Sequence, residues 1–162
     1  MIVIVPMRAA LGLAVTLSVA CMAIEVRAED SSPWQRDAHS AVRLLAGSRS
    51  GAVLLGGIAL QLQPGWHTYW RTPGDSGVPP RFDFSKSDNV EAVAVLFPAP
   101  QKFDDGAGGT SLGYTHKIVL PLRITAKDAN KPVTLRADIN YAVCEKICIP
   151  VAKKRTVGTL AR

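Results

Sequence analysis

Cysteine is scarce in this chain, which has three among its 162 residues. Cys21 lies in an apolar N-terminal stretch, so the rest of the sequence holds only Cys144 and Cys148. A chain of this length has a core large enough to fold without disulfides, which excludes the class of small domains that depend on them. The sequence therefore raises the question of whether the remaining pair is a chemically active switch or a structural brace.

Three other features are missing. No stretch sustains the apolar period of a helix and no internal repeat is present, which excludes helical bundles and repeat arrays. After the N-terminal stretch, no segment approaches the roughly 20 apolar residues that span a bilayer, so no stable membrane insertion of the mature domain is expected. Basic residues are scattered except at 153–155 and have no interleaved aromatics, so nucleic acid is not a predicted partner.

The N-terminus has the pattern of a secretory signal peptide. Arg8 precedes an apolar stretch over residues 9–24, and Val26-Arg27-Ala28 fits the small-x-small site of a leader peptidase. A retained anchor is the alternative. The predicted division of the chain is a signal peptide over 1–28, a flexible lead-in over 29–39 and one domain over 40–162.

Short apolar and β-branched runs, broken by Gly, Pro and Asp, predict an all-β chain. Side chains alternate in them: Leu120, Leu122 and Ile124 point to one face, with polar neighbours on the other. Strands at this spacing are typical of an immunoglobulin-like two-sheet sandwich, and a small closed barrel is the alternative. The predicted strands are 41–46, 53–62, 66–71, 80–84, 90–97, 117–125, 133–143 and 149–160.

The longest predicted irregular segment runs over residues 98–115. It contains the glycine-rich stretch 104–109, which does not favour a strand. A loop of this length is typical of a lid or a binding loop, and tolerance of an insertion is the alternative.

The spacing of the two cysteines requires a turn between them. Four positions of extended strand span about 13 Å, whereas a disulfide needs Cα atoms about 4.4–6.8 Å apart. The β-branched neighbours favour extended structure and Pro150 interrupts a helix. We therefore predict that Cys144 and Cys148 face each other across a hairpin whose tip is Glu145, Lys146 and Ile147.

Three hypotheses compete for the pair. A bridge that encloses so short a loop removes about 2 kcal/mol of unfolded-state entropy, against about 4.7 for a 100-residue loop, so it is a poor brace. Redox exchange is the favoured hypothesis, and a structural hairpin disulfide in a binding or adaptor domain is the second. A copper or zinc site is the third, with His67 and His116 as candidates by residue type alone.

Several ordered motifs carry a family resemblance: residues 64–80 (PGWHTYWRTPGDSGVPP), 97–100 (FPAP), 113–114 (GY), 119–121 (VLP) and 141–150 (YAVCEKICIP). Together they resemble the N-terminal periplasmic domain of DsbD and ScsB-type thiol:disulfide interchange proteins. The resemblance implies an immunoglobulin-like sandwich in the periplasm. It also implies a cysteine pair that takes electrons from a thioredoxin-like or membrane-embedded donor and passes them to disulfide-bearing acceptors, with no cofactor.

The resemblance also implies roles for single residues. Cys148 matches the cysteine that forms a mixed disulfide with partners, and Cys144 matches the one that resolves it. His67 and Tyr69 match aromatic positions beside the pair. The remaining candidates, in or near a loop that caps the cysteines, are Asp105, Gly106, Ala107, Gly108 and Tyr114.

Ordinary structural roles are the alternatives at these positions. Tyr69 and Tyr114 also suit core packing, His67 an exposed strand position and Asp105 a turn. The cap loop of the family carries an aromatic residue, whereas residues 106–109 here are Gly-Ala-Gly-Gly. The membrane segments and thioredoxin-like domain that usually follow are not in this sequence, so we expect a stand-alone module or part of a longer protein.

Overall fold

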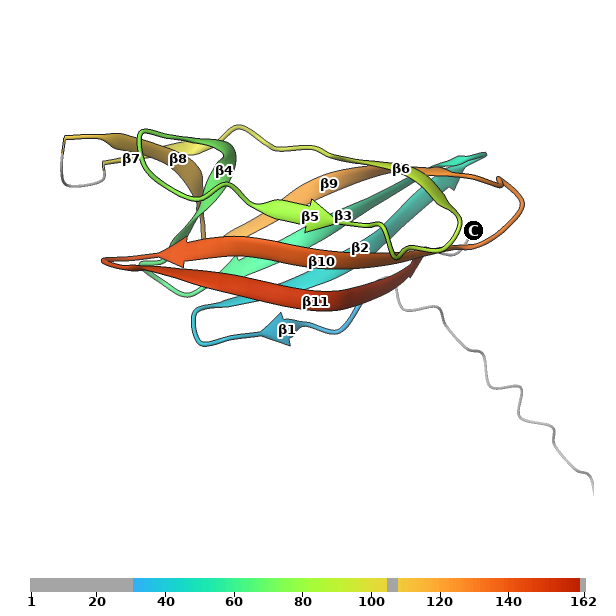
Figure 1. Ribbon diagram of the computed structural model, residues 1–162, viewed down its shortest axis with the longest axis horizontal. Helices are drawn as coiled ribbons and strands as arrows, with labels where there is room; N and C mark the ends of the chain where they lie inside the picture. Colours follow the sequence, from blue (N-terminus) through green and yellow to red (C-terminus); the bar gives the residue numbers. More distant parts are fainter. Residues whose placement is uncertain (1–30, 105–107, 161–162) are drawn as a thin grey trace, which may run out of the picture.

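The computed structural model describes residues 31–104 and 108–160, with the backbone alone over 155–160. The predicted signal peptide over 1–28 lies outside these residues. Every regular element of the described part is a β-strand, arranged in two sheets (Figure 1). The prediction of an all-β, two-sheet domain is therefore confirmed, and the arrangement is consistent with an immunoglobulin-like fold.

The first sheet is antiparallel and joins segments from both halves of the chain. Its strands, in spatial order, are β1 (Gln35–Arg36), β2 (Ser40–Ser50), β3 (Val53–Leu62), β9 (Lys117–Ala126) and β6 (Val90–Val95).

The second sheet is also antiparallel and contains both cysteines. Its strands, in spatial order, are β11 (Cys148–Leu160), β10 (Val133–Cys144), β4 (His67–Gly74), β8 (Thr110–Thr115) and β7 (Gln101–Asp104), and β5 (Arg81–Asp83) pairs with β10 further along that strand.

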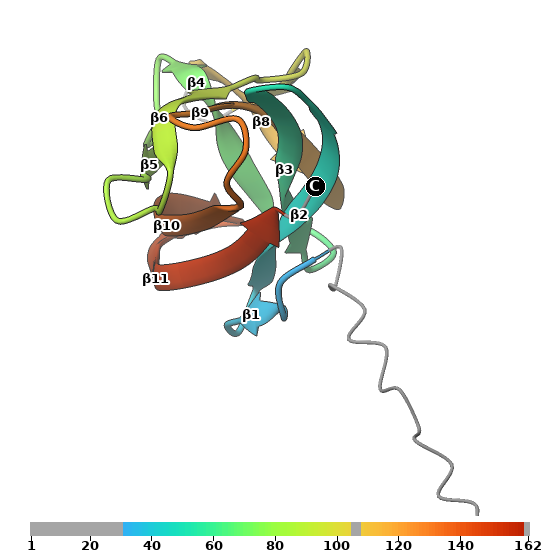
Figure 2. The ribbon, with the colours of Figure 1, turned by 90° about the vertical axis from the view of Figure 1, so that its right-hand side faces the viewer.

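The hydrophobic core lies between the two sheets, whose strands surround a common interior in Figure 2. Alternating residues of β9 and β10 point inward, as their sequence patterns predict. Burial of these side chains is the main favourable term that holds the sheets together. Side chains with at most 1% of their surface exposed include Ile58, Leu122, Ile124, Val133, Leu135 and Ile139.

The prediction of one irregular segment over 98–115 is wrong, because β7 and β8 form a hairpin within it. That prediction rests on the glycine-rich stretch 104–109 and extends it over the flanking residues, which include Gly113. Here a Cβ at Gly113 would collide with the carbonyl oxygen of Thr68 on β4, so the glycine permits the close approach of β8 to β4. The connection that remains runs from Asp104 to Thr110.

The described part of the predicted flexible lead-in, residues 31–39, differs from that expectation because it lies along β2. The backbone N–H of Ser32 donates to the carbonyl oxygen of Leu44 over 2.8 Å, and the Leu44 N–H donates to Ser32 Oγ over 2.9 Å. The Arg43 guanidinium lies 4.5 Å from the ring centre of Trp34. One tryptophan and one serine thus anchor a segment whose polar composition suggested no structure.

A chain of polar contacts joins the sheets beside β1. Ser40 Oγ donates to Asp37 Oδ2 over 2.7 Å, and since that uses its proton, the Tyr141 hydroxyl donates to Ser40 Oγ over 2.7 Å. Lys153 Nζ on β11 lies 3.4 Å from Asp37 Oδ2. Burial raises the pKa of Asp37, but hydrogen bonds from His39 and Ser40 and the charge of Lys153 outweigh it and lower the pKa. These contacts fix the β10–β11 hairpin against the first sheet.

Candidate functional site

The two cysteines face each other where β10 ends and β11 begins, at one end of the molecule (Figure 1). They form a disulfide with their Cα atoms 4.1 Å apart. The turn between them is closed by a hydrogen bond of 3.2 Å from the Glu145 N–H to the Ile147 carbonyl oxygen. The predicted hairpin, with residues 145–147 at its tip, is therefore confirmed.

The two sulfur-bearing residues differ sharply in exposure. Cys144 has 2% of its surface exposed and lies in a small apolar cluster with Tyr69 and Ala142, whereas Cys148 is exposed. The tip beside Cys148 is open, since Ile147 is 69% exposed. Because thiol–disulfide exchange requires access to a sulfur, Cys148 is the more accessible of the two residues to an incoming thiolate.

Strand β4 creates this asymmetry by pairing with the end of β10. His67 is the register partner of Cys144, and Thr68 is the partner of Val143. The Thr68 side chain stabilises the pairing of β4 with β10, because its hydroxyl donates to the carbonyl oxygen of Ala142 over 2.7 Å. Since alternate residues of a strand share a face, His67 and Tyr69 lie on the same outer face as Cys144.

Tyr69 makes a polar contact with the disulfide. Its hydroxyl oxygen lies 3.2 Å from Cys148 Sγ, within hydrogen-bonding distance for sulfur. Gly77 helps to fix the ring: a Cβ at that position would lie 2.5 Å from a ring carbon, and its φ of 120° also favours glycine. Only glycine lets the segment after β4 pass this closely over the tyrosine.

Burial favours the neutral form of both aromatic neighbours. It raises the pKa of Tyr69, so the hydroxyl keeps its proton at neutral pH and can donate it to sulfur. It lowers the pKa of His67, so the imidazole is neutral at pH 7. The two rings meet edge to face with their centres 5.4 Å apart. The disulfide therefore lies beside a neutral, partly buried aromatic surface.

Phe103 completes that surface, and sequence reasoning missed it. Its ring stacks on His67 with the centres 4.8 Å apart. The resemblance directed attention to the glycines at 106–109, which carry no ring, whereas the phenylalanine lies on the preceding strand β7. Phe103 is the only phenylalanine within 98–115. The sequence does not show its role, which depends on the pairing of β7 with β8.

The structure places the other predicted residues as follows. Gly108 lies in the connection between β7 and β8 with a φ of 86°. Asp105, Gly106 and Ala107 lie outside the described residues.

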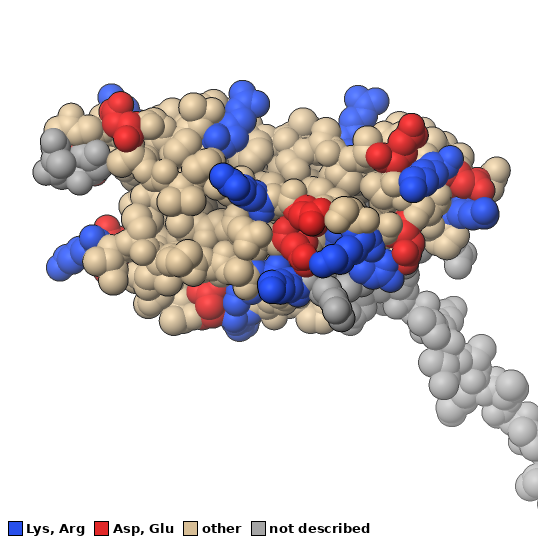
Figure 3. Space-filling model, in the orientation of Figure 1, with Lys and Arg blue, Asp and Glu red and all other residues tan. Residues whose placement is uncertain are grey.

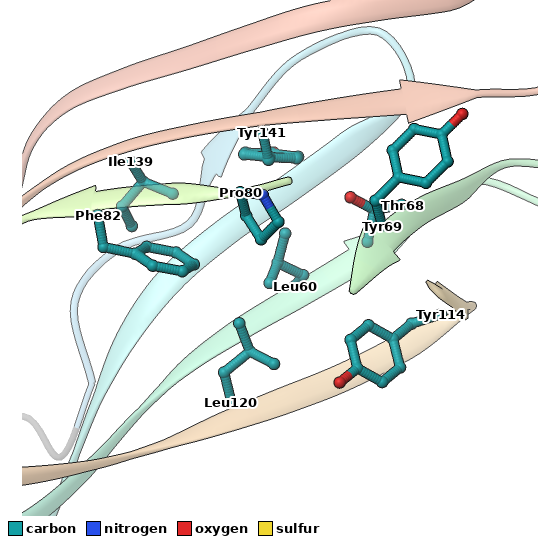
Figure 4. Close-up of a pocket in the computed structure, with 9 residues that line it drawn as sticks. All are labelled: Leu60, Thr68, Tyr69, Pro80, Phe82, Tyr114, Leu120, Ile139 and Tyr141. Atoms are coloured by element: carbon teal, nitrogen blue, oxygen red, sulfur yellow. The ribbon is translucent and has the colours of Figure 1, made fainter. Parts of the chain in front are cut away.

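Tyr114 does not join the cysteines. It pairs with Thr68, so its side chain lies on the inner face of the sheet, where it lines a core cavity of about 10 Å³ (Figure 4). Its hydroxyl donates to the Pro98 carbonyl oxygen over 2.8 Å, and burial raises its pKa to about 12 against a smaller opposing effect of Arg71. The core-packing alternative therefore describes Tyr114.

The described residues contain no group of three His, Cys, Asp or Glu side chains that is able to hold a metal ion. His67 lies across from Cys144, while His116 occupies the turn between β8 and β9 with a φ of 58°. Within the same residues, no helix is long and apolar enough to cross a membrane.

Comparison with protein families identifies the chain. The family model described as "Thiol:disulfide interchange protein DsbD, N-terminal" matches residues 39–159. The chain belongs to this family. The match spans both sheets and includes the cysteine hairpin, which fits a thiol–disulfide exchange module.

One solved structure supports the fold. The N-terminal periplasmic domain of ScsB from Proteus mirabilis is 27% identical, with a TM-score of 0.65. That match covers 81% of this chain and 51% of the ScsB domain, so the chain spans about half the length of this relative. A search of curated proteins finds no match.

Two further structures match less well. The reduced N-terminal domain of DsbD from Neisseria meningitidis is 12% identical, with a TM-score of 0.40, covering 74% of this chain and 90% of that domain. The GAE domain of yeast GGA1 is 11% identical, with a TM-score of 0.43, covering 79% of this chain and 96% of that domain.

Proposed function

We propose that this domain passes electrons to partner proteins through Cys148 and Cys144. The observation that carries the proposal is the asymmetry of the pair: Cys148 is exposed, whereas Cys144 is 2% exposed at the end of β10. An exchanging pair needs one sulfur that meets partners and a second that meets only the first. The short hairpin supplies both at a fixed distance.

In the reductive direction both residues begin as thiols. The thiolate of Cys148 attacks one sulfur of the partner disulfide, which forms a mixed disulfide and expels the other partner sulfur as a thiolate. Cys144 then loses its proton and attacks Cys148 Sγ, and the first partner sulfur leaves as a second thiolate. Two electrons pass from the domain to the partner, and the domain keeps the disulfide seen here.

Tyr69 assists the first step. Its protonated hydroxyl, 3.2 Å from Cys148 Sγ, donates a hydrogen bond that stabilises negative charge on that sulfur. A lower thiol pKa increases the thiolate fraction at neutral pH, and the thiolate is the attacking species. His67 stays neutral and adds no positive charge, so the hydroxyl is the main polar contribution from β4.

The cellular setting is part of the proposal. We infer that residues 1–28 are cleaved on export and that the domain acts in the periplasm, where ScsB N-terminal domains are found. The donor is a dithiol protein of the thioredoxin-like class or a membrane-embedded reductase domain. The acceptor is a protein disulfide, and no cofactor takes part.

A redox titration combined with cysteine variants tests this function. The protein is equilibrated in glutathione or dithiothreitol buffers of graded potential, and free thiols are trapped by alkylation. We expect a potential within the range of known oxidoreductases, about −120 to −270 mV. A potential well below about −300 mV identifies a permanent bridge and overturns the proposal in favour of an adaptor domain.

Single variants then assign the two roles. Cys144→Ser is expected to accumulate a mixed disulfide with an added disulfide-bearing protein, because the resolving thiol is absent. Cys148→Ser is expected to form none, because the remaining thiol is buried. The reverse pattern contradicts the assignment. Stoichiometric binding of Cu(I) by the reduced protein, without exchange, supports the metal hypothesis instead.

A further inference from the structure

A groove of about 550 Å³ begins at Cys148 and continues along the outer face of the β10–β11 hairpin. Its wall is the segment that leads into β5, with Val78 and Pro79. Val78 is 53% exposed, so it presents an apolar surface to solvent at the wall of the groove. Figure 3 shows the face on which the hairpin lies: basic and acidic side chains project at the hairpin tip, and the surface between the tip and the middle of the molecule is largely uncharged.

Small side chains produce the groove. Outward from the disulfide, the next cross-strand pair on the outer face is Ala142 with Pro150, and the one after it is Asn140 with Ala152. Larger residues at these positions would fill the space between the hairpin and Val78. The groove thus continues, on the same face of the hairpin, the series of cross-strand pairs that begins with the disulfide.

We propose that this groove binds, in extended form, the segment that flanks the reactive cysteine of a partner protein. The inference rests on the proposed function, because the partner's cysteine must reach Cys148. In a mixed disulfide the two Cα atoms lie about 4.4–6.8 Å apart, so the partner's chain passes directly beside Cys148. The groove is the hollow that Cys148 itself lines, so the adjoining residues of that chain enter it.

The dimensions and the lining specify the segment. From Cys148 to Ala152 the strand extends about 13 Å, which accommodates roughly four extended residues of the partner. The floor and wall are mainly apolar and suit small or medium apolar side chains. Arg81 is the one charged residue among those that line the groove, and it pairs with Asn140 at the end away from Cys148.

This arrangement predicts charge complementarity as well as shape. An acidic residue about four positions from the partner's cysteine reaches Arg81, whereas a basic residue there meets a like charge. The proposed occupant is therefore an extended, apolar segment with a carboxylate near its far end. A segment of this kind gives affinity through burial and orientation through one ion pair.

Exchange kinetics with two probes test the proposal. One probe is a short apolar peptide with a cysteine and a glutamate four residues away, and the other is glutathione. Both carry the same 2-nitro-5-thiobenzoate leaving group, so that release of the coloured thiol reports attack on each. We expect the reduced protein to react with both, and Val78→Glu and Ala152→Trp to slow the peptide reaction at least about tenfold while leaving the glutathione reaction unchanged.

Two controls make the result decisive. Leu96→Glu changes a loop residue of similar exposure, 52%, that follows β6 of the other sheet, and should leave both reactions unchanged. Replacement of the peptide's glutamate by lysine should slow attack by the unsubstituted protein. Arg81→Gln should remove the difference in rate between the two peptides.

Equal effects of Val78→Glu on both probes, or none on either, overturn the groove proposal. If the unsubstituted protein attacks neither probe, the proposed function fails and the groove proposal fails with it.

Discussion

The two sheets use the same kind of strand in different ways. In the first sheet, β3 and β9 pair without interruption from Val53 with Thr125 to Gln61 with Lys117. In the second sheet, β4 pairs with β10 only at His67 and Thr68, and its register with β8 breaks between Tyr69 and Gly74. The regular pair is scaffold, and the interrupted strand supplies His67 and Tyr69 beside the cysteines.

The interruption has a chemical use. Because β4 leaves β10 after Thr68, the segment that follows can fold back over Tyr69, and Gly77 lies against the ring. A strand paired along its whole length would leave no room for this cover beside the disulfide. The first sheet thus contributes to stability alone, whereas the second contributes both to the core and to access to sulfur, and the difference is open to direct tests.

The largest expected effect separates stability from chemistry in the first sheet. Ile58 on β3 is fully buried, so Ile58→Ala leaves a cavity and should lower the free energy of unfolding by about 2–5 kcal/mol. Denaturant titration measures the loss. Leu55→Ala, on the same strand but 50% exposed, is the control and should change the free energy by less than about 0.5 kcal/mol. The rate of exchange by folded Ile58→Ala should equal that of the unsubstituted protein, and a slower rate would contradict the division between the sheets.

Gly77→Ala should affect both properties at once. The new Cβ requires a left-handed φ and collides with the Tyr69 ring, which we expect to cost about 1–3 kcal/mol of stability. Displacement of the ring also removes the hydroxyl from Cys148, so the folded variant should alkylate more slowly at that thiol. Gly51→Ala is a matched control, because Gly51 has a φ of 58° with open space around it. A Gly77 variant with unchanged alkylation would show that the glycine has no part in positioning Tyr69.

The division between the sheets also explains what the sequence predicts well. Alternation and β-branching are local signals, so β3 has the predicted bounds, and the spacing of Cys144 and Cys148 defines the hairpin. Both depend on residues close together in the chain. The family resemblance adds His67 and Tyr69, which the structure places beside the pair.

Sequence analysis fails where strands distant in the chain meet. The sequence does not show why residue 113 is a glycine until β8 lies against β4. Phe103 has no visible partner until β7 pairs with β8. Gly77 is one glycine among thirteen in the sequence, and only the nearby ring distinguishes it. The unequal exposure of the cysteines likewise arises from β4 covering one of them. Their catalytic roles remain predictions.

Tyr69→Phe should have a smaller effect, confined to the chemistry. Loss of one hydrogen bond should raise the pKa of the Cys148 thiol, because the thiolate loses a donor, and should slow its alkylation at neutral pH by up to about tenfold. The pH dependence of the alkylation rate in the reduced protein measures this pKa. Tyr114→Phe is the matched control, since its hydroxyl bonds to Pro98 on the inner face and should leave the thiol unaffected. A thiol pKa that is the same in all three proteins would exclude the hydroxyl as a stabiliser of the thiolate.

The smallest expected effect is a pH dependence that arises from His67 in the second sheet. Burial lowers the pKa of His67 in the folded protein, so the unfolded chain takes up this proton more readily. The contribution of His67 to stability is therefore complete above the unfolded value of about 6.5 and is lost as the pH falls through the lower, folded pKa. Asp37 gives a separate loss at more acidic pH, because its pKa is lowered from 3.8. Unfolding free energies of His67→Gln and the unsubstituted protein, measured between pH 7 and 4.5, should converge as the imidazole becomes charged.

Phe103→Ala tests the cause of this burial. The substitution exposes the imidazole and should move the pKa of His67 back toward its ordinary value. An unchanged titration of His67 in that variant would show that the stacked ring is not what buries it.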